Sequence, residues 1–344
     1  MRGALTSLIS STSFLWIGAV AAAQSPPQTD EPPLSLETSF EAAKQEVQNQ
    51  LLNAPEASYI YLTHWIDIYN QSKSAEEIFS FERKIERPDK AAQDDAAPLK
   101  QTDWQPNGFP IVSPEWRYLT PISFSPASRF RPDPPPDVES EEFQKDAKDV
   151  LAYGDDYSLT RRADEALASA FWANGPGTET PPGRWNIIAL ESSKSLPRAQ
   201  RTALMLRLNI ALYDAGIAAF DAKYHYDYWR PQTAIRQLYP EQADWGPMMQ
   251  PPFHPEYVSG HSAFSGAAAA AVLEHYLGRK RFCITAPELF DLERCFAGFN
   301  EAAEEAGRSR IFGGIHFEFS NQAGLKLGRD VAEQVIFNID LSED

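Results

Sequence analysis

The sequence is poor in cysteine and in positive charge. Its 344 residues contain only two cysteines, Cys283 and Cys295, and lack the closely spaced pairs that zinc sites and thioredoxin-like centres use. The two thiols either form a disulfide that closes a short loop or stay as separate buried thiols, and the sequence leaves both open. The 31 lysines and arginines face 48 acidic residues, which gives a formal net charge of -17. Because nucleic acids and anionic membranes need a basic face, neither is expected as a partner.

Long apolar runs without charges are also scarce. One lies at the N-terminus, where Arg2 precedes an apolar stretch that ends in three alanines at positions 21–23. This pattern predicts a signal peptide over residues 1–23, and a single N-terminal membrane anchor is the alternative. The apolar run over 204–220 contains Arg207 and Asp214, so no further membrane span is expected. We therefore expect a secreted protein, periplasmic or extracellular, with no membrane contact after cleavage.

The alternation typical of β-strands is rare, whereas helical spacing is common. A proline-rich linker is expected over 24–35, followed by one helical catalytic domain over 36–344. We divide this domain into N-terminal helices (36–100), a proline-rich surface coil (101–139) and a catalytic helical core (140–344). The expected helices cover residues 36–53, 58–69, 75–85, 141–153, 163–172, 198–230, 262–277 and 321–339, the last capped by Ser320. The predicted fold is therefore all-α, a helical bundle.

The first of three unusual segments contains Lys223 and Arg230. These cations are seven positions apart, which is two helical turns, so a continuous helix would project both from one face. Two cations on a helix usually mark a solvated surface. Here Tyr224, Tyr226 and Trp229 lie between them, which is unusual for a face in water.

The other two segments combine histidine with groups that bind anions. Ser259, Gly260 and His261 lead into an alanine-rich predicted helix, whose start offers free backbone N–H groups and the positive end of the helix dipole. The last segment places Arg310 and two glycines before His316, and such a loop can bend closely around a ligand. Taken singly, each segment is also compatible with a purely structural role, such as an ordinary helix cap beside an exposed histidine.

Together the three segments indicate a pocket for an oxyanion. They supply three cations, helix N-terminal amides and two imidazoles, and they contain no cluster of acidic residues that would hold a hard divalent metal. Charged donors in this number suit an anion with several oxygens. A histidine beside such an anion can move a proton or act as a ligand or nucleophile.

These segments resemble the three-part signature shared by vanadium-dependent haloperoxidases and the type-2 phosphatidic acid phosphatase superfamily. The spacings from Lys223 to Arg230 and from Arg310 to His316 match the signature, and Val258 stands where it usually has proline. Upstream, residues 171–173, 177–178, 181–182 and 185–186 look like the segment that haloperoxidases carry before the lysine motif. The similarity covers residues 164–316.

The resemblance implies a role for each matching residue. The donors to the equatorial oxygens of one vanadate per chain would be Lys223, Arg230, Ser259, Gly260 and Arg310. His316 would coordinate vanadium axially, and His261 would be the acid–base residue beside the apical oxygen. Lys223 would also polarise bound peroxide, and Asp164 would pair with Arg310.

The resemblance also implies the substrates, hydrogen peroxide and a halide. His254 lies seven residues before His261, where bromoperoxidases tend to carry histidine, so bromide or iodide is expected rather than chloride. The alternative is a secreted acid phosphatase with His316 as nucleophile and His261 as general acid, because vanadate mimics phosphate. A silent anion-binding protein is the third possibility, but binding alone needs no imidazoles.

Overall fold

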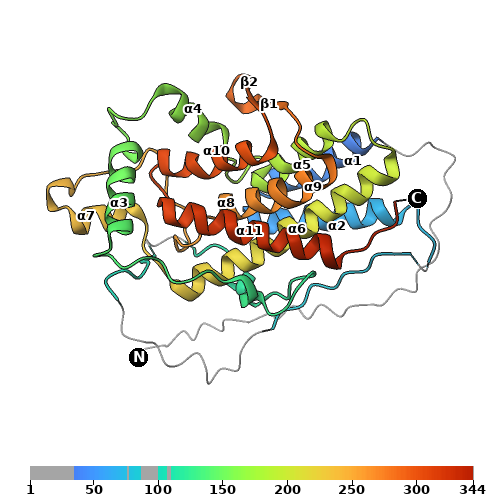
Figure 1. Ribbon diagram of the computed structural model, residues 1–344, viewed down its shortest axis with the longest axis horizontal. Coiled ribbons are helices and arrows are strands. Elements are labelled where there is room, and N and C mark those ends of the chain that lie inside the picture. Colours follow the sequence, from blue (N-terminus) through green and yellow to red (C-terminus); the bar gives the residue numbers. More distant parts are fainter. Residues whose placement is uncertain (1–34, 76, 87–99, 107–109, 344) are drawn as a thin grey trace, which may run out of the picture. The chain divides into compact units, whose positions relative to one another are not determined.

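Helices account for nearly all of the regular structure. The computed structural model describes residues 35–343 except 76, 87–99 and 107–109, and only the backbone of 268–271. The predicted signal peptide (1–23) and residues 24–34 of the predicted linker lie outside the described residues. In the described part the prediction of an all-α fold is confirmed (Figure 1).

Most of the helices lie in the C-terminal two thirds of the chain. The α-helices are α1 (Leu36–Asn49), α2 (Ala54–Asn70), α3 (Glu141–Gly154), α4 (Ala163–Phe171), α5 (Thr180–Ser192), α6 (Arg198–Tyr226), α7 (Pro231–Leu238), α8 (Gly260–Ser265), α9 (Glu274–Leu277), α10 (Phe299–Phe312) and α11 (Glu318–Asn338). Short 3₁₀ turns are η2 (Pro114–Tyr118), η3 (Ala127–Phe130), η4 (Pro240–Gln242) and η6 (Pro287–Leu289), and a π-helical stretch, η5 (Gly266–Leu273), joins α8 to α9. The strands β1 (Phe282–Ala286) and β2 (Leu292–Phe296) form one antiparallel hairpin.

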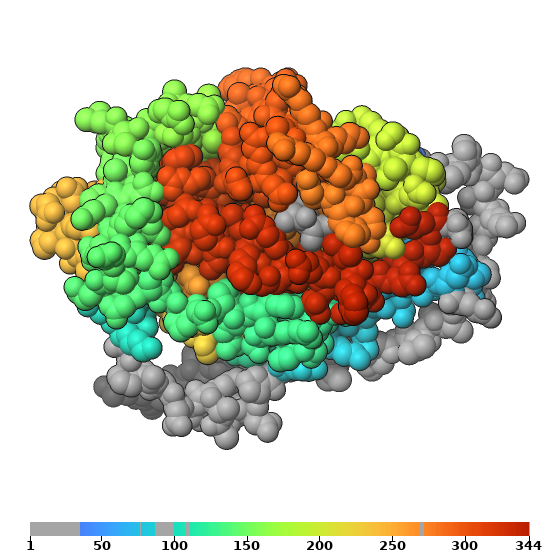
Figure 2. Space-filling model, in the orientation of Figure 1, coloured from blue at the N-terminus to red at the C-terminus, as the bar shows by residue number. Residues whose placement is uncertain are grey.

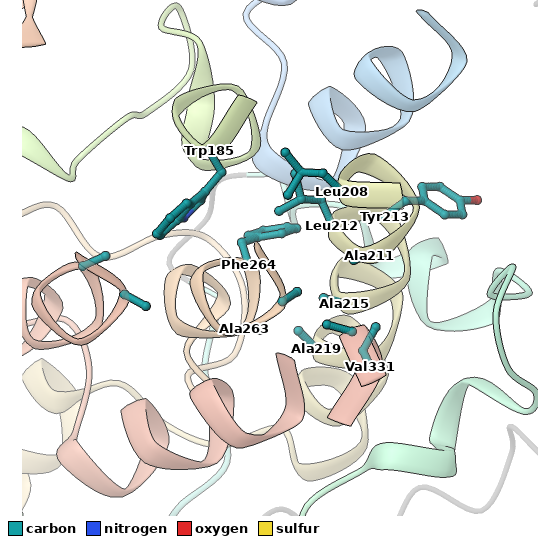
Figure 3. Close-up of a cluster of buried hydrophobic side chains, with 14 of the residues drawn as sticks. Trp185, Leu208, Ala211, Leu212, Tyr213, Ala215, Ala219, Ala263, Phe264 and Val331 are labelled. Carbon is teal, nitrogen blue, oxygen red and sulfur yellow. The ribbon is translucent and has the colours of Figure 1, made fainter. Parts of the chain in front are cut away.

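Helix α6 forms the centre of the bundle and packs against α2, α5, α8 and α11. Every residue from Thr202 to Lys223 is buried, so this helix is enclosed by protein on all sides. Of the helices that the structure describes, α6 alone is long and apolar enough to cross a membrane, and its apolar window is wholly buried in the protein. Figure 3 shows its contacts with Trp185 of α5, Phe264 of α8 and Val331 of α11. It is therefore a core helix.

Helices α8 and α11 pack with their backbones in direct contact. A Cβ on Gly324 of α11 would lie 2.6 Å from the Ser259 carbonyl oxygen, and one on Gly328 would lie 2.2 Å from that of Ala263. No side chain fits at either position, so glycine is what allows this close approach. The Ser259 N–H also donates to the Ser320 carbonyl (3.2 Å). The contact holds the start of α8 firmly against α11.

The predicted helix over 75–85 is wrong. In its described residues this segment is mostly extended, and Ile85 forms an antiparallel bridge with Leu119. The Arg83 guanidinium lies over the rings of Tyr59 (4.8 Å) and Trp116 (5.3 Å). These tertiary contacts, together with the backbone pairing, outweigh the weak helical preference of the segment. The N-terminal helices therefore end at residue 70.

The last predicted helix begins earlier than expected. Helix α11 starts at Glu318 after Phe317, which makes no side-chain cap, and Ser320 lies inside its first turn rather than capping it. The sequence analysis did not predict helices α5, α7 and α10 or the β1–β2 hairpin. The part of α10 around Arg310 was expected to be a loop.

The hairpin carries the two cysteines. Cys283 and Cys295 are paired residues of β1 and β2 and form a disulfide, which removes the alternative of two buried thiols. Figure 1 shows the hairpin beside α10.

The proline-rich segment lies outside the helical core as predicted. In its described residues it is irregular coil with the turns η2 and η3. It runs along α11 (Figure 2), and a groove of about 740 Å³ between them is lined by residues of the coil, α3 and α11.

Candidate active site

Lys223 and Arg230 reach the site from two helices, and the prediction that they share one helix face is wrong. Helix α6 ends at Tyr226, and Asp227 adopts a left-handed conformation (φ 47°) that turns the chain. Arg230 is the N-cap residue of α7. The turn between the helices, rather than a continuous helix, brings the two cations together.

Lys223 is fully buried in the last turn of α6. Its Nζ donates to the carbonyl oxygens of Pro255 and Glu256, both at 2.9 Å. Burial and then the nearby Arg230 lower the pKa of the Lys223 ammonium well below its usual value, while Glu256 raises it. The amine therefore lies in a site where an added negative charge would be strongly favoured.

Arg230 connects the middle and the last of the three motifs. Its Nη1 donates to the Ile315 carbonyl (2.9 Å) and lies 3.2 Å from His316 Nε2. Its Nη2 donates to the His254 carbonyl (2.9 Å) and lies 3.0 Å from His254 Nδ1. Burial lowers the pKa of Arg230 to about 10. The predicted halide residue His254 thus contacts Arg230, with its ring against Phe220 (5.3 Å between centroids).

Ser259 and Gly260 form the start of α8. Ser259 is the N-cap residue, and its side chain accepts from the Ser262 N–H. Gly260 faces Lys223, because a Cβ built on it would lie 3.9 Å from Lys223 Cε. The start of α8 therefore lies beside Lys223.

His261 follows on the first turn of α8 and is partly accessible to solvent. Its Nε2 lies 3.2 Å from the Ala173 carbonyl oxygen, which can only accept, so Nε2 carries a proton and Nδ1 is free to accept one. Burial and the Arg310 charge lower the pKa of His261 to about 3, so the ring is neutral near pH 7. A neutral imidazole beside an anion site can act as a base.

Arg310 lies in the last turn of α10 and is fully buried. Its Nη2 donates to the Ser169 carbonyl (2.6 Å), and its Nε donates to Ser309 Oγ (2.9 Å). Burial lowers its pKa to about 9. In the part of the chain that the structure describes, no carboxylate forms an ion pair with Arg310.

The predicted pairing of Asp164 with Arg310 is wrong. Asp164 is 68% exposed in the first turn of α4 and forms its ion pair with Arg294 of β2 at 2.9 Å. Arg294 also pairs with Glu305 of α10 (2.6 Å). The α4 group that contacts Arg310 is instead the Ser169 carbonyl, five residues further along the helix.

His316 and Glu256 form a buried pair that the sequence analysis did not predict. The two side chains are 3% and 0% exposed, and His316 Nδ1 lies 2.6 Å from Glu256 Oε1. The same oxygen accepts from the Phe317 N–H (3.1 Å). Burial raises the pKa of Glu256 to about 7, against the lowering effect of Arg230 and Lys223. An acidic residue inside a cationic motif was the only sequence signal for this contact.

The charges of the motif residues act on one another. Burial is the main cause that lowers the pKa of His316, and the charges of Arg230, Lys223, His254 and His261 lower it further. Among the described residues, the cations Lys223, Arg230 and Arg310 have no carboxylate ion-pair partner, although all three are at most 3% exposed. Among the described residues, Glu256 is the carboxylate whose charge acts on Lys223 and Arg230, and one carboxylate among three buried cations leaves positive charge unbalanced. Unbalanced buried charge is costly, so this donor set fits a bound oxyanion.

Comparison with protein families matches residues 203–340 to the second helical-bundle domain of vanadium chloroperoxidase. The chain is 26% identical over 171 residues to vanadium chloroperoxidase of Curvularia inaequalis, a match that covers 41% of this chain. The matched region spans 28% of the length of that relative.

Solved structures show the same fold over a longer stretch. A bacterial vanadium-dependent iodoperoxidase superposes with a TM-score of 0.75 at 24% identity, covering 92% of this chain and 99% of that one. The apo form of a bacterial vanadium-dependent chloroperoxidase superposes with a TM-score of 0.56 at 17% identity, covering 69% and 61%. At these identities the likeness concerns the fold.

Proposed function

We propose that this chain, which is similar to the vanadium haloperoxidases over residues 203–340, is a vanadate-dependent haloperoxidase that oxidises bromide or iodide with hydrogen peroxide. The observation that carries the proposal is the group of three buried cations, Lys223, Arg230 and Arg310, without carboxylate partners among the described residues. One vanadate per chain would supply the missing negative charge.

The donors around the cluster suit the oxygens of vanadate. Lys223, Arg230 and Arg310 would donate from three directions, and Ser259 and Gly260 would add a hydroxyl and a helix N-terminal amide. His316 would offer the unprotonated Nε2 as a ligand to vanadium. When bound, vanadate acts as a Lewis acid that activates peroxide without a change of oxidation state.

His261 would move the proton at this site. Because its Nε2 donates to the Ala173 carbonyl, Nδ1 would accept the proton that peroxide releases on binding. His254 beside Arg230 supports a larger halide, and the fold match to an iodoperoxidase supports iodide in particular.

The proposal includes export of the mature chain. It rests on the charged, apolar and small-residue pattern over residues 1–23. Intact mass of the protein recovered from the periplasm and medium of an expressing bacterium tests it. A mass that corresponds to cleavage after Ala23 supports export, and an uncleaved chain in the membrane fraction contradicts it.

The activity test is halogenation of a cyclic dione dye by the mature protein in phosphate-free buffer. Hydrogen peroxide is present throughout, bromide and iodide are compared, and vanadate is added or left out. We expect turnover that depends on vanadate. Hydrolysis of a phosphate ester without halogenation at any vanadate concentration would identify a phosphatase, with His316 as nucleophile.

His316→Ala is the matched variant for this test. If His316 is the axial ligand, the variant loses tight vanadate binding and halogenation together, while its circular dichroism stays that of a helical protein. Vanadate affinity equal to that of the wild type would remove His316 from this role.

A further inference from the structure

Glu256 links all three motif segments of the site. Its side chain contacts His316, its carbonyl oxygen accepts from Lys223 Nζ (2.9 Å), and its N–H donates to the carbonyl of Tyr228 (2.9 Å), two residues before Arg230. No part of the carboxyl group is exposed. A buried carboxylate is costly unless hydrogen-bond donors or positive charges stabilise it.

The contacts of His316 determine which ring nitrogen carries the proton. An ionised Glu256 can only accept, so the 2.6 Å contact with it then places a proton on Nδ1. An arginine N–H donates, so the 3.2 Å contact with Arg230 Nη1 requires a lone pair on Nε2. The two contacts lie on opposite nitrogens, and both require the same tautomer. His316 therefore presents an unprotonated Nε2 to the cation cluster.

We propose that Glu256 is the positioning residue of His316, which fixes the ring by its Nδ1–H bond so that Nε2 is available as ligand or nucleophile. The inference rests on the proposed function for what Nε2 binds, but not for the tautomer. Carboxylates that hold the second nitrogen of a ligating histidine orient the ring and make it more basic. Glu256 belongs to the middle motif and His316 to the last one. The middle motif would therefore contribute a residue that orients the histidine of the last motif.

A purely structural role is the competing explanation, because the same Glu256 oxygen also accepts from the Phe317 N–H just before α11. The chain offers a matched control. Asp146 Oδ2 accepts from the Phe319 N–H (2.7 Å) in the first turn of the same helix, its side chain is 4% exposed, and it has no contact with His316. Asp146→Leu removes a buried side chain that accepts a hydrogen bond at the start of α11, and it removes no contact of His316.

The first measurement is the tautomer of His316 by ¹⁵N NMR of the vanadate-free protein labelled at histidine. The chain has six histidines, and loss of one signal set in His316→Ala assigns the ring. We expect a protonated Nδ1 and an unprotonated Nε2 in the wild type and in Asp146→Leu, and a mixture of tautomers in Glu256→Leu. A wild-type ring protonated at Nε2 overturns the proposal without any variant.

The second measurement is vanadate affinity, titrated with orthovanadate in phosphate-free buffer. Glu256→Leu should weaken binding about 10–100-fold, and Asp146→Leu should leave it within a factor of about three. Glu256→Gln retains an acceptor oxygen, so it should recover a large part of the affinity, and it serves if Glu256→Leu does not fold. Equal losses of vanadate affinity in Glu256→Leu and Asp146→Leu would show that Glu256 serves only to cap helix α11. If the wild type binds no vanadate, the proposed function fails, and the tautomer still decides the role of Glu256.

Discussion

At the scale of single residues, the candidate site places three cations where water cannot screen them. Lys223, Arg230 and Arg310 are all buried, and burial lowers the pKa of each. Their hydrogen bonds go largely to carbonyl oxygens, which satisfy donors but do not neutralise charge. A bound anion, as proposed, would offset the cost of burying these side chains.

His261→Ala should separate vanadate binding from turnover. The imidazole is not needed as a donor to hold the anion, since three cations and the start of α8 remain, so affinity should change little. Without a base beside bound peroxide, kcat should fall about 10²–10⁴-fold. Vanadate titration and steady-state halogenation of the same preparation measure the two effects, and wild-type kcat in the variant would exclude proton transfer by His261.

Asp164→Asn should have almost no effect on the site. The Asp164–Arg294 pair is largely exposed on the aspartate side, and such pairs contribute roughly 0–1 kcal/mol. We expect unchanged vanadate affinity and a melting temperature within about 2 °C of the wild type. A tenfold loss of affinity would mean that Asp164 acts on Arg310 after all.

The residues of the site were predictable where their chemistry lies in motifs. Lys223, Arg230, Ser259, Gly260 and His316 were predicted together because charged donors and glycines recur at fixed spacing. Asp164 was placed wrongly and Glu256 was overlooked for one reason: partner choice depends on which side chains meet in space. Asp164 faces the hairpin, and only the fold shows that Glu256 faces His316.

At the scale of elements, the turn between α6 and α7 positions two of the cations. Asp227 occupies a left-handed conformation there, and the Trp104 N–H and the Trp229 N–H tie the turn to residues 102–104 of the proline-rich coil. A helical pattern continues through this turn in the sequence, which is why one face was expected for both cations. Aspartate tolerates left-handed geometry better than most residues, and that preference is too weak to locate a helix end from sequence.

Asp227→Asn should remove a pH-dependent loss of stability. Burial, and then the Asp103 carboxylate, raise the pKa of Asp227 from 3.8 to about 6 in the folded protein. Because the folded-state pKa is the higher one, this group stabilises the fold fully below pH 3.8, and the contribution is lost as the pH rises through about 6. Asparagine accepts the same backbone conformation and never ionises.

The variant should therefore gain stability over the wild type between pH 4.5 and pH 8. Asp227 is partly exposed, so solvent screening limits the gain to about 1 kcal/mol. Urea unfolding at the two pH values measures it. The same difference between variant and wild type at both pH values would show that Asp227 does not titrate in this window.

The elements themselves were largely predictable from periodicity. The sequence indicates the buried face of α3, the long run of α6 that is mostly apolar, and the glycines that follow several helices. The structure of the segment over 75–85 was not predictable, because Arg83 packs against two aromatic rings that lie far away in the sequence. The hairpin was missed because two five-residue strands carry little alternation.

At the scale of the whole molecule, the chain combines a net charge of -17 with a cationic centre. The site is assembled from α6, α8, α10 and the segment before α11, which are far apart in the sequence and meet only in the folded state. An anion that binds this centre therefore binds the native state and not the unfolded chain. Binding of this kind must raise the stability of the whole fold.

Vanadate at about 100 times its dissociation constant should stabilise the protein by about 2.7 kcal/mol, which corresponds to a melting temperature about 5 °C higher. Arg310→Met tests whether the anion binds at Arg310. The variant should raise the melting temperature without vanadate and lower it with vanadate, relative to the wild type. Removing a buried charge that lacks a counter-ion relieves several kcal/mol, and the unpaired Ser169 carbonyl costs about 1–3 kcal/mol. The vanadate-free variant should thus melt slightly higher than the wild type, while most of the vanadate-induced shift is lost. Calorimetry with and without vanadate measures both, and an equal vanadate shift in the two proteins would place the anion away from Arg310.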